Sequence, residues 1–296
     1  GVDAGHRQRA RILPRAGTVG RKLAGRIVWN GSRAVSQCSI RFYEELNDFL
    51  PPERRKVCFN HDFQRRASIK DMIEALGVPH TEVDLILVNG ESVDFSYIVR
   101  DGDRISVYPL FESFDIQPLV RVRLRPLRTS RFVLDVHLGK LARYLRLLGF
   151  DTLYRNDCDD AELARLASAE QRILLTRDRD LLKRAMVTHG FFVRATDPRR
   201  QIEEVLDRLD LYRAIQPFLR CARCNGLLAA ASKRQVWERL PPKTRLYVKA
   251  FWACGQCGQV YWEGSHLPHI RRFIDTLQAR GGGETPFAGQ IAGAGK

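Results

Sequence analysis

Aspartates follow two short apolar stretches of this sequence. Asp135 comes directly after residues 132–134, and Asp178 lies two residues after the stretch Ile173–Thr176. Short apolar runs predict buried strands of a parallel sheet, and the carboxyl ends of such strands meet at one edge. Asp160, at the predicted start of a helix, can join them there. Carboxylates gathered in this way repel one another unless a cation lies between them, so the pattern predicts a site for a hard divalent metal ion.

A metal ion held by carboxylates suits the hydrolysis of a phosphodiester. One or two Mg²⁺ or Mn²⁺ ions would make a water nucleophilic near neutral pH and would stabilise charge on the leaving oxygen. We therefore interpret this site as that of a metal-dependent nuclease, with Asp135, Asp160 and Asp178 as its ligands.

Other charged residues near this edge could also take part. The additional acidic candidates are Asp180, Asp197 and Glu162. Asp180 also fits the cap of a helix that follows it, and Asp197 also fits a turn before a proline. The basic candidates for contacts with phosphates are Lys140, Arg143 and Arg177. Taken singly, each of these side chains also fits an ordinary solvated surface.

Four of the seven cysteines form two CxxC pairs. Cys221 and Cys224 make the first pair, and Cys254 and Cys257 make the second about thirty residues later. Two such pairs supply the four thiolates that tetrahedral Zn²⁺ takes in a structural site. Four thiolates leave no open position, so this zinc is expected to be structural. His266 and His269 follow the second pair; we expect packing or phosphate contacts for them and no metal binding.

Charge is distributed unevenly along the 296 residues, whose net charge is +15. Residues 219–280 carry 11 Lys and Arg against 3 Asp and Glu, whereas residues 36–112 carry 9 against 14. A polyanionic partner is therefore expected to meet the C-terminal half. No apolar run approaches the ~20 residues that cross a bilayer, and the N-terminus lacks the apolar core of a signal peptide. We expect a cytoplasmic protein.

Composition and periodicity divide the chain into six predicted segments. They are a disordered basic tail over 1–35, a β-grasp domain over 36–112, a basic linker over 113–130, an α/β domain over 131–218, a zinc-ribbon module over 219–280 and a disordered tail over 281–296.

The order strand, strand, helix, strand, strand over residues 36–112 predicts an α+β β-grasp domain. Ser68 fits the N-cap of its helix, and Gly77 fits the helix end. The segment VNGESVDFSYIVRDGDRISVYP resembles the ubiquitin-like sulfur-carrier proteins. Those carriers act through a free C-terminal Gly-Gly pair, whereas this strand continues into Leu-Phe-Glu-Ser at 110–113. We therefore expect a structural or protein-docking module.

Apolar strands alternate with amphipathic helices over residues 131–218, which predicts a doubly wound parallel sheet. The predicted strands are Phe132–Asp135, Asp151–Tyr154, Ile173–Thr176 and Phe191–Arg194. The predicted helices are Leu138–Leu148, Asp160–Glu170, Leu181–Val187 and Gln201–Leu209. Lys140, Arg143 and Arg146 are expected on the face of the first helix that points away from its apolar stripe.

Two sets of residues carry a family resemblance. The pattern D-x-x-L-A followed by L-x-T-x-D-x-D, over residues 160–180, resembles the signature of PIN-domain ribonucleases. With FVLDVHLGKLARYLRLLGFDTLY before it and RCARCNG and CGQCGQVYWEGSH after it, the chain resembles bacterial proteins with a Mut-seven C-terminal RNase domain. In that family a PIN-like domain is fused to a zinc ribbon, and many members carry an N-terminal ubiquitin-like domain. The resemblance implies an RNA substrate, single-stranded or structured as in tRNA, dependence on Mg²⁺ or Mn²⁺, and catalytic roles for Asp135, Asp160 and Asp178.

Two other functions fit the same sequence. The first is a non-catalytic adaptor that binds RNA or the ribosome through the zinc ribbon and the β-grasp domain. The second is an interaction module for sulfur-transfer enzymes, which the missing Gly-Gly pair makes a weaker interpretation.

Overall fold

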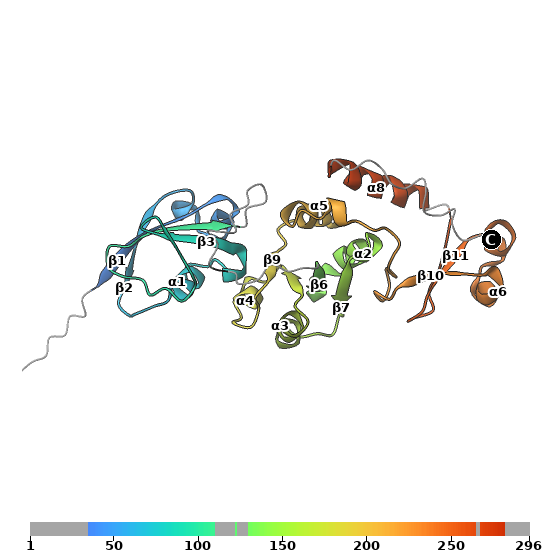
Figure 1. The fold of residues 1–296 in the computed structure, drawn as a ribbon, viewed down its shortest axis with the longest axis horizontal. Helices are drawn as coiled ribbons and strands as arrows, with labels where there is room; N and C mark the ends of the chain where they lie inside the picture. The colour runs from blue at the N-terminus through green and yellow to red at the C-terminus, as the bar shows by residue number, and fades with distance from the viewer. Residues whose placement is uncertain (1–34, 110–121, 123–129, 265–266, 282–296) are drawn as a thin grey trace, which may run out of the picture. The chain divides into compact units, whose positions relative to one another are not determined.

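The computed structural model describes residues 35–109, 122, 130–264 and 267–281 (Figure 1). The two predicted tails and the predicted basic linker lie almost wholly outside these residues, as does His266. Within the described ranges, no helix combines the length and apolar character that crossing a bilayer requires.

The N-terminal sheet has five strands in the order β2-β1-β5-β3-β4, and only β1 and β5 pair in parallel. Its strands are β1 (Ser36–Phe42), β2 (Phe59–Phe63), β3 (Val83–Val88), β4 (Glu91–Val93) and β5 (Arg104–Pro109). Its helical segments are α1 (Ile69–Ala75) and the 3₁₀ turns η1 (Glu44–Phe49), η2 (Pro52–Arg54) and η3 (His80–Glu82). The predicted β-grasp order of strand, strand, helix, strand, strand is present, with β4 as an additional short strand that the sequence did not predict.

Local chemistry sets the ends of these elements. The Ser68 side chain accepts a hydrogen bond from the backbone N–H of Asp71, which caps α1 as predicted. Gly77 ends the helix with φ +98°, a value that glycine adopts without strain. Asn89 (φ 54°) and Gly90 (φ 92°) form the tight turn between β3 and β4.

The second sheet has four parallel strands in the order β7-β6-β8-β9, which confirms the predicted α/β fold. Its strands are β6 (Arg131–Leu134), β7 (Asp151–Tyr154), β8 (Ile173–Thr176) and β9 (Gly190–Phe192). The helical segments are η4 (Val136–Leu138), α2 (Gly139–Leu147), α3 (Asp160–Ala169), α4 (Arg179–Leu182), α5 (Pro198–Arg208) and η5 (Tyr212–Ala214). The predicted helix over Leu181–Val187 is therefore shorter than expected and begins earlier.

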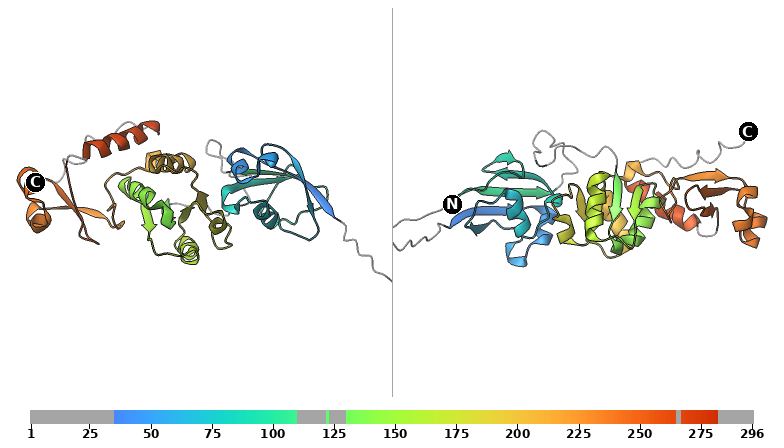
Figure 2. Two further views of the ribbon diagram at one scale, coloured as in Figure 1. Left: turned by 180° about the vertical axis from the view of Figure 1, so that it is seen from behind. Right: turned by 90° about the horizontal axis from the view of Figure 1, so that it is seen from below.

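Helices cover both faces of this parallel sheet (Figures 1 and 2). One core contains Phe132 and Leu134 of β6 together with the apolar stripes of α2 and α5. The other contains Val133 of β6 and Leu174 of β8 together with α3 and α4. Because side chains of one strand alternate between the two cores, every residue of β8 is buried.

The C-terminal part contains a small antiparallel sheet in the order β10-β11-β12. Its elements are β10 (Leu228–Ala231), α6 (Lys233–Val236), η6 (Trp237–Arg239), α7 (Pro242–Tyr247), β11 (Phe251–Cys254), β12 (Val260–Trp262) and α8 (Leu267–Arg280). Val236, Leu240, Phe251 and Val260 form its core. Ile274 and Leu277 of α8 pack instead into the core that α2 and α5 share.

Candidate active site and metal centre

Asp135 and Asp178 lie at the carboxyl ends of two neighbouring parallel strands. Asp135 follows β6 directly, and Asp178 comes two residues after the end of β8. The buried Thr176 hydroxyl donates a hydrogen bond to Asp135 Oδ2 (2.7 Å) and accepts one from the backbone N–H of Asp178 (2.9 Å). A single threonine hydroxyl therefore connects the two aspartates. Thr176 is part of the L-x-T-x-D-x-D pattern, which by itself does not indicate this role.

The two aspartates differ in exposure and in their other contacts. Asp135 is buried, at 5% exposed, whereas Asp178 is exposed. Asp178 Oδ1 accepts hydrogen bonds from the backbone N–H groups of Asp180 (2.8 Å) and Leu181 (3.5 Å), so Asp178 is the N-cap of α4. Within the described part of the chain, Asp178 Oδ2 has no hydrogen-bond donor. That oxygen is available to a ligand.

Asp180 does not cap the helix, so that interpretation of its role is wrong. The helix begins at Arg179, which moves the cap position from Asp180 to Asp178. The Asp180 side chain is 89% exposed and lies 3.3 Å from Lys183 Nζ.

Asp160 is the first residue of α3, but its neighbour Asp159 is the helix cap. Asp159 Oδ1 accepts from the backbone N–H of Glu162 at 2.8 Å. The Asp160 carboxylate is about half exposed, and its Oδ2 lies 3.7 Å from a guanidinium nitrogen of Arg184. Because α3 follows β7, Asp160 lies at the same edge of the sheet as Asp135 and Asp178.

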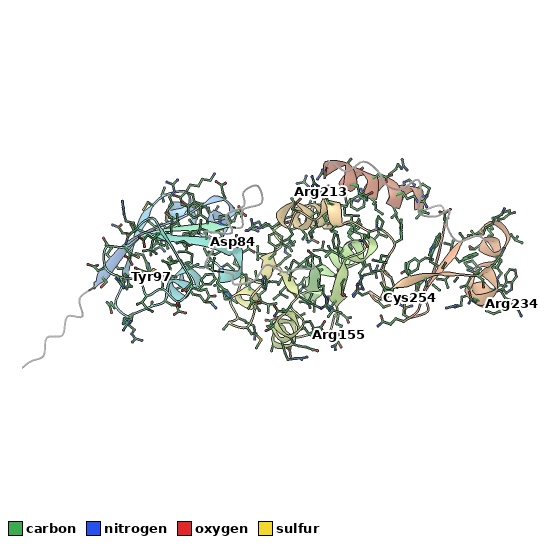
Figure 3. All side chains as sticks on the ribbon, in the orientation of Figure 1. Asp84, Tyr97, Arg155, Arg213, Arg234 and Cys254 are labelled. Carbon is green, nitrogen blue, oxygen red and sulfur yellow. The ribbon has the colours of Figure 1, made fainter. Side chains whose placement is uncertain are left out.

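Glu162 and Asp197 have other partners. Glu162 Oε1 pairs with Arg155 at 2.9 Å, and the same guanidinium binds Asp157 (Arg155 is labelled in Figure 3). The hydrogen bond from Arg155 lowers the pKa of the Asp157 carboxyl below its ordinary value. Asp197 caps α5, since its Oδ1 accepts from the N–H groups of the second and third residues of that helix.

The structure links Asp135 to Asp178 but does not bring Asp160 within ligand distance of both. In the described ranges, four cysteines are the only group of three or more His, Cys, Asp or Glu side chains whose ligand atoms lie close enough to share one metal ion. At the acidic edge, Asp135 and Asp178 therefore form a connected pair, and the Asp160 carboxylate stands apart from them.

The three predicted phosphate contacts have different surroundings. Lys140 and Arg143 are exposed on α2, and neither forms an ion pair with another described residue. Arg177 instead donates to the carbonyl oxygen of Ala195 at 2.7 Å, which ties the end of β8 to the segment after β9.

Arg146 does not share the exposed face of Lys140 and Arg143, so that prediction is wrong. Its side chain is buried and donates to the carbonyl oxygens of Thr152 (2.9 Å) and Arg223 (2.9 Å). Backbone carbonyl groups between Cys221 and Cys224 lie beside α2 and need hydrogen-bond donors, and the Arg146 guanidinium donates to them.

The four cysteine Sγ atoms lie within 4.8 Å of one another (Cys254 is labelled on β11 in Figure 3). The Sγ atoms of Cys221 and Cys257 are 3.7 Å apart, and those of Cys224 and Cys254 are 3.4 Å apart. Thiolates about 2.3 Å from a tetrahedral Zn²⁺ would stand about 3.8 Å from one another. The cluster therefore fits zinc, and His269 lies outside it.

Hydrogen bonds favour the thiolate form of Cys221. Tyr261 Oη lies 3.2 Å from Cys221 Sγ. Burial raises the pKa of this thiol, but hydrogen bonds from Tyr261 and from the backbone of Cys224 and Arg223 lower it to about 7. The deprotonated sulfur is the form that binds metal.

Asp151, at the start of β7, connects the cysteine cluster to the parallel sheet. Its Oδ1 accepts hydrogen bonds from Arg172 (2.8 Å) and Asn225 (2.9 Å), and Arg131 and Arg220 each approach its Oδ2 to 3.5 Å. Burial alone would raise the pKa of Asp151, but the hydrogen bonds from Arg172 and Asn225 outweigh burial and lower it. Because Asp151 begins β7, the cysteine cluster lies at the edge of the sheet opposite the acidic residues.

The β-grasp domain contacts the open edge of β9. The buried Glu82 carboxylate at the end of η3 accepts from the backbone N–H of Phe192 (2.6 Å) and lies 3.4 Å from a guanidinium nitrogen of Arg194. Arg194 also binds Asp48 Oδ2 at 3.1 Å. His80 Nε2 lies 2.8 Å from the carbonyl oxygen of Val187.

Two family models match this chain. Residues 130–274 match the Mut7-C RNAse domain, and residues 35–115 match the Mut7-C ubiquitin domain. The first match covers both the parallel sheet and the four cysteines. No curated protein matches the chain.

Two crystal structures are similar to one part of the chain. One, of the H. volcanii small archaeal modifier protein 1, is 17% identical, covers 25% of this chain and 97% of its own, and has a TM-score of 0.21. The other, of SAMP1 from Haloferax volcanii, is 16% identical, covers 27% of this chain and 100% of its own, and has a TM-score of 0.22.

Proposed function

Since residues 130–274 form a Mut7-C RNAse domain and residues 35–115 form a Mut7-C ubiquitin domain, we propose that this chain is a metal-dependent ribonuclease of the PIN-like type. The observation that carries the proposal is the pair Asp135 and Asp178 at the carboxyl edge of the parallel sheet, joined through the Thr176 hydroxyl.

The donor set fits Mg²⁺ or Mn²⁺. These ions prefer carboxylate oxygens, and Mg²⁺ commonly keeps several waters while it binds only one or two carboxylates. Asp135 and Asp178 would supply those two, and Asp160 on the same edge would bind directly or through a water. The bound metal would activate a water and stabilise the leaving oxygen.

The protein's own side chains prepare this chemistry. The hydrogen bond from Thr176 orients the Asp135 carboxylate, because Asp135 Oδ2 is held at 2.7 Å. Asp178 uses Oδ1 for its helix cap and keeps Oδ2 for the metal. Lys140 and Arg143 would hold phosphates of the substrate near this edge.

The remaining parts would support binding. The four cysteines would hold a structural Zn²⁺, and the zinc ribbon would help to bind RNA, either single-stranded or structured as in tRNA. The β-grasp domain would dock a protein partner, and the cytoplasm is the compartment in which we expect the enzyme.

A cleavage assay tests the proposal. Purified full-length protein is incubated with a labelled pool of small RNAs and Mn²⁺, and Asp135→Asn and Asp178→Asn are compared with the wild type. We expect both variants to lose cleavage by at least about 100-fold, since each change removes a charged metal ligand. Asp210→Asn is the matched control: Asp210 is exposed with φ 46°, a conformation that asparagine adopts readily.

Two results would contradict the proposal. Equal cleavage in both variants and the wild type would remove these residues from the mechanism. RNA binding without metal-dependent cleavage in the wild type, with folding shown by circular dichroism, would favour the non-catalytic adaptor.

A further inference from the structure

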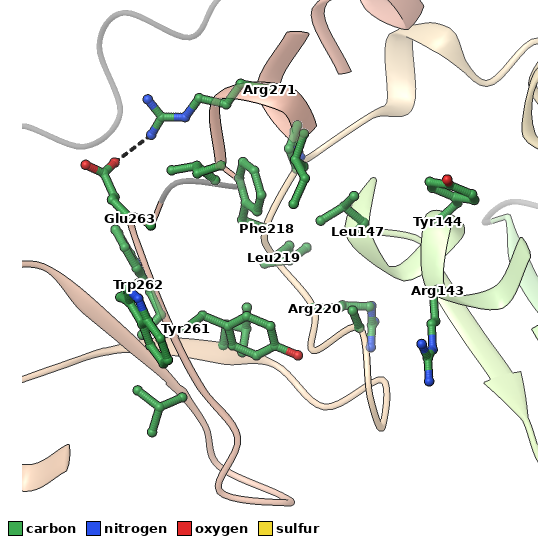
Figure 4. A pocket seen from close by; sticks show the side chains of 18 of the residues that line it. Arg143, Tyr144, Leu147, Phe218, Leu219, Arg220, Tyr261, Trp262, Glu263 and Arg271 are labelled. Atoms are coloured by element: carbon green, nitrogen blue, oxygen red, sulfur yellow. Dashed lines mark hydrogen bonds and ion pairs between the residues drawn. The ribbon is translucent and has the colours of Figure 1, made fainter. Parts of the chain in front are cut away.

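A large groove runs beside α2 on the face that points away from the sheet (Figure 4). Among its lining residues, Lys140 lies in the first turn of α2 and Asp197 follows β9, so both come from the carboxyl-end side of the parallel sheet, where the acidic edge lies. Trp252 of β11 and Trp262 of β12 also line it. The groove is therefore lined both by residues from the carboxyl-end side of the parallel sheet and by strands of the cysteine module.

The groove has a positive lining. It contains six Lys and Arg side chains, against Asp197 and Glu263. Lys140, Arg143 and Lys243 form no ion pair with any described residue. The lining cations are Lys140, Arg143, Arg199, Arg220, Lys243 and Arg271.

Two of these arginines have unused donors. The Nε atoms of Arg220 and Arg271 are buried and have no hydrogen-bond acceptor among the described residues. Because these Nε atoms are buried, it is the outer guanidinium nitrogens of the two side chains that would contact phosphate oxygens of a ligand. Arg271 also pairs with Glu263 at 2.7 Å, so its guanidinium is held in place at the rim (Figure 4).

Aromatic rings face the same space from both walls. Tyr144 of α2 lies on one wall, and Tyr261 and Trp262 of β12 lie on the other, with Phe218 between them (Figure 4). Tyr247, at the end of α7, also lines the groove and is 81% exposed. Positive charge interleaved with accessible rings is the composition of surfaces that bind single strands by stacking.

We propose that this groove binds a single-stranded segment of RNA and guides it from the cysteine module to the acidic edge. The proposal rests on the ribonuclease function above and specifies its substrate. The cations would contact phosphates, and the rings, with Tyr247 as the most accessible, would stack on unpaired bases. Bases of a duplex are already stacked and paired, so a duplex would gain only the phosphate contacts.

The size of the groove supports a polymeric ligand. Its volume is about 1900 Å³. Sites for small molecules usually measure roughly 300–1,000 Å³, so this groove exceeds what one small molecule fills.

Fluorescence anisotropy tests the proposal with full-length, zinc-loaded protein. The probes are a labelled 12-nucleotide RNA and a duplex of the same sequence, without added Mg²⁺ or Mn²⁺, in an Asp178→Asn background that prevents cleavage. We expect Tyr247→Ala and Arg143→Glu each to weaken single-strand binding by about 10-fold. The matched controls are Trp237→Ala, an exposed ring outside the groove, and Arg165→Glu, an exposed charge on α3, and both should bind as the background does.

The outcomes separate this proposal from the ribonuclease proposal. If Tyr247→Ala and Arg143→Glu bind the single strand as well as their controls do, the groove is not the binding site, even if the wild type cleaves RNA. If they lose binding while the wild type shows no metal-dependent cleavage, the groove assignment stands and the nuclease proposal fails. Equal affinity for the duplex would overturn the single-strand assignment.

Discussion

Thr176 is placed where one side chain can position both of the proposed metal ligands. A hydroxyl can donate and accept at once, so it can orient a carboxylate and satisfy a backbone N–H together. Thr176 does both, towards Asp135 and Asp178, and its side chain is fully buried. Buried partners of this kind typically change metal affinity or activity by about 10- to 100-fold when they are removed.

Replacing this hydroxyl tests whether it positions the aspartates. Thr176→Val keeps the shape of the side chain but removes both hydrogen bonds, so we expect Mn²⁺ affinity and cleavage rate to fall by about 10- to 100-fold. Thr176→Ser should restore most of both. The measurements are Mn²⁺ binding by electron paramagnetic resonance and the rate of RNA cleavage. If Thr176→Val binds Mn²⁺ as tightly as the wild type does, the Thr176 hydroxyl does not position the aspartates for metal binding and its role is purely structural.

At the scale of single residues, the sequence predicted where the aspartates lie in the fold more accurately than which groups their side chains contact. Asp135 and Asp178 could be placed because uninterrupted apolar strands precede them. The capping role of Asp178 was missed because helix ends depend on local hydrogen bonds that differ little between neighbouring aspartates. The burial of Arg146 was missed because its acceptor at Arg223 is 77 residues away in the chain.

At the scale of elements, strands were predicted more accurately than short helices. β7 and β8 have the predicted bounds because each is a short stretch confined between the helices on either side of it. α4 ends at Leu182 although apolar residues continue to Val187, because a four-residue helix has little intrinsic stability and tertiary packing sets its length.

The Asp151 network attaches the cysteine module to β7, and its removal should loosen that module. Asp151→Asn keeps the size of the side chain but breaks its ion pair with the buried Arg172, so we expect a loss of about 2–4 kcal/mol in unfolding free energy and faster zinc release to a chelator. Urea denaturation and a colorimetric zinc assay measure these effects. Asp157→Asn, which removes an exposed partner of Arg155, is the control and should change neither.

The depressed pKa of Asp151 adds a pH dependence to this prediction. A carboxyl whose folded pKa lies below its unfolded value contributes stability that is present above the unfolded pKa and is lost as the pH falls through the folded value. Wild type and Asp151→Asn should therefore differ most at neutral pH; the difference should begin to shrink below about pH 4 and disappear once the pH is below the folded pKa of Asp151. A constant difference across this range would mean that the charge of Asp151 is not what holds the module.

At the scale of the whole described chain, the β-grasp domain protects an otherwise open strand edge. β9 pairs with β8 on one side only, and unpaired strand edges invite aggregation. The Glu82 carboxylate accepts the Phe192 N–H on the other side, and the Phe49 ring packs edge-on against the Phe192 ring at 5.4 Å. The sequence predicted a docking module but not this contact, because residues more than 100 positions apart create it.

The pair formed by Glu82 and Arg194 allows a test of this contact. Arg194→Met keeps the apolar part of the side chain but leaves the Glu82 carboxylate buried without its cation, so we expect a loss of roughly 3–5 kcal/mol in unfolding free energy. Glu82→Gln retains an oxygen that can accept the Phe192 N–H and avoids a buried charge, so it should cost less, about 1 kcal/mol. The double variant should be more stable than Arg194→Met alone, which urea denaturation of all four proteins would measure.

The pH dependence of these variants identifies the group responsible. Burial raises the pKa of Glu82 even when Arg194 is present, and without that cation the pKa should rise further. A raised folded pKa means that the folded state takes up a proton before the unfolded chain does, so Arg194→Met should gain stability as the pH falls from 7 towards 5. The double variant has no carboxylate at position 82 and should lack this gain. If Arg194→Met shows the same slope as the double variant, Glu82 is not buried against β9 in solution, and the contact between the ubiquitin-like and nuclease domains is not the one described.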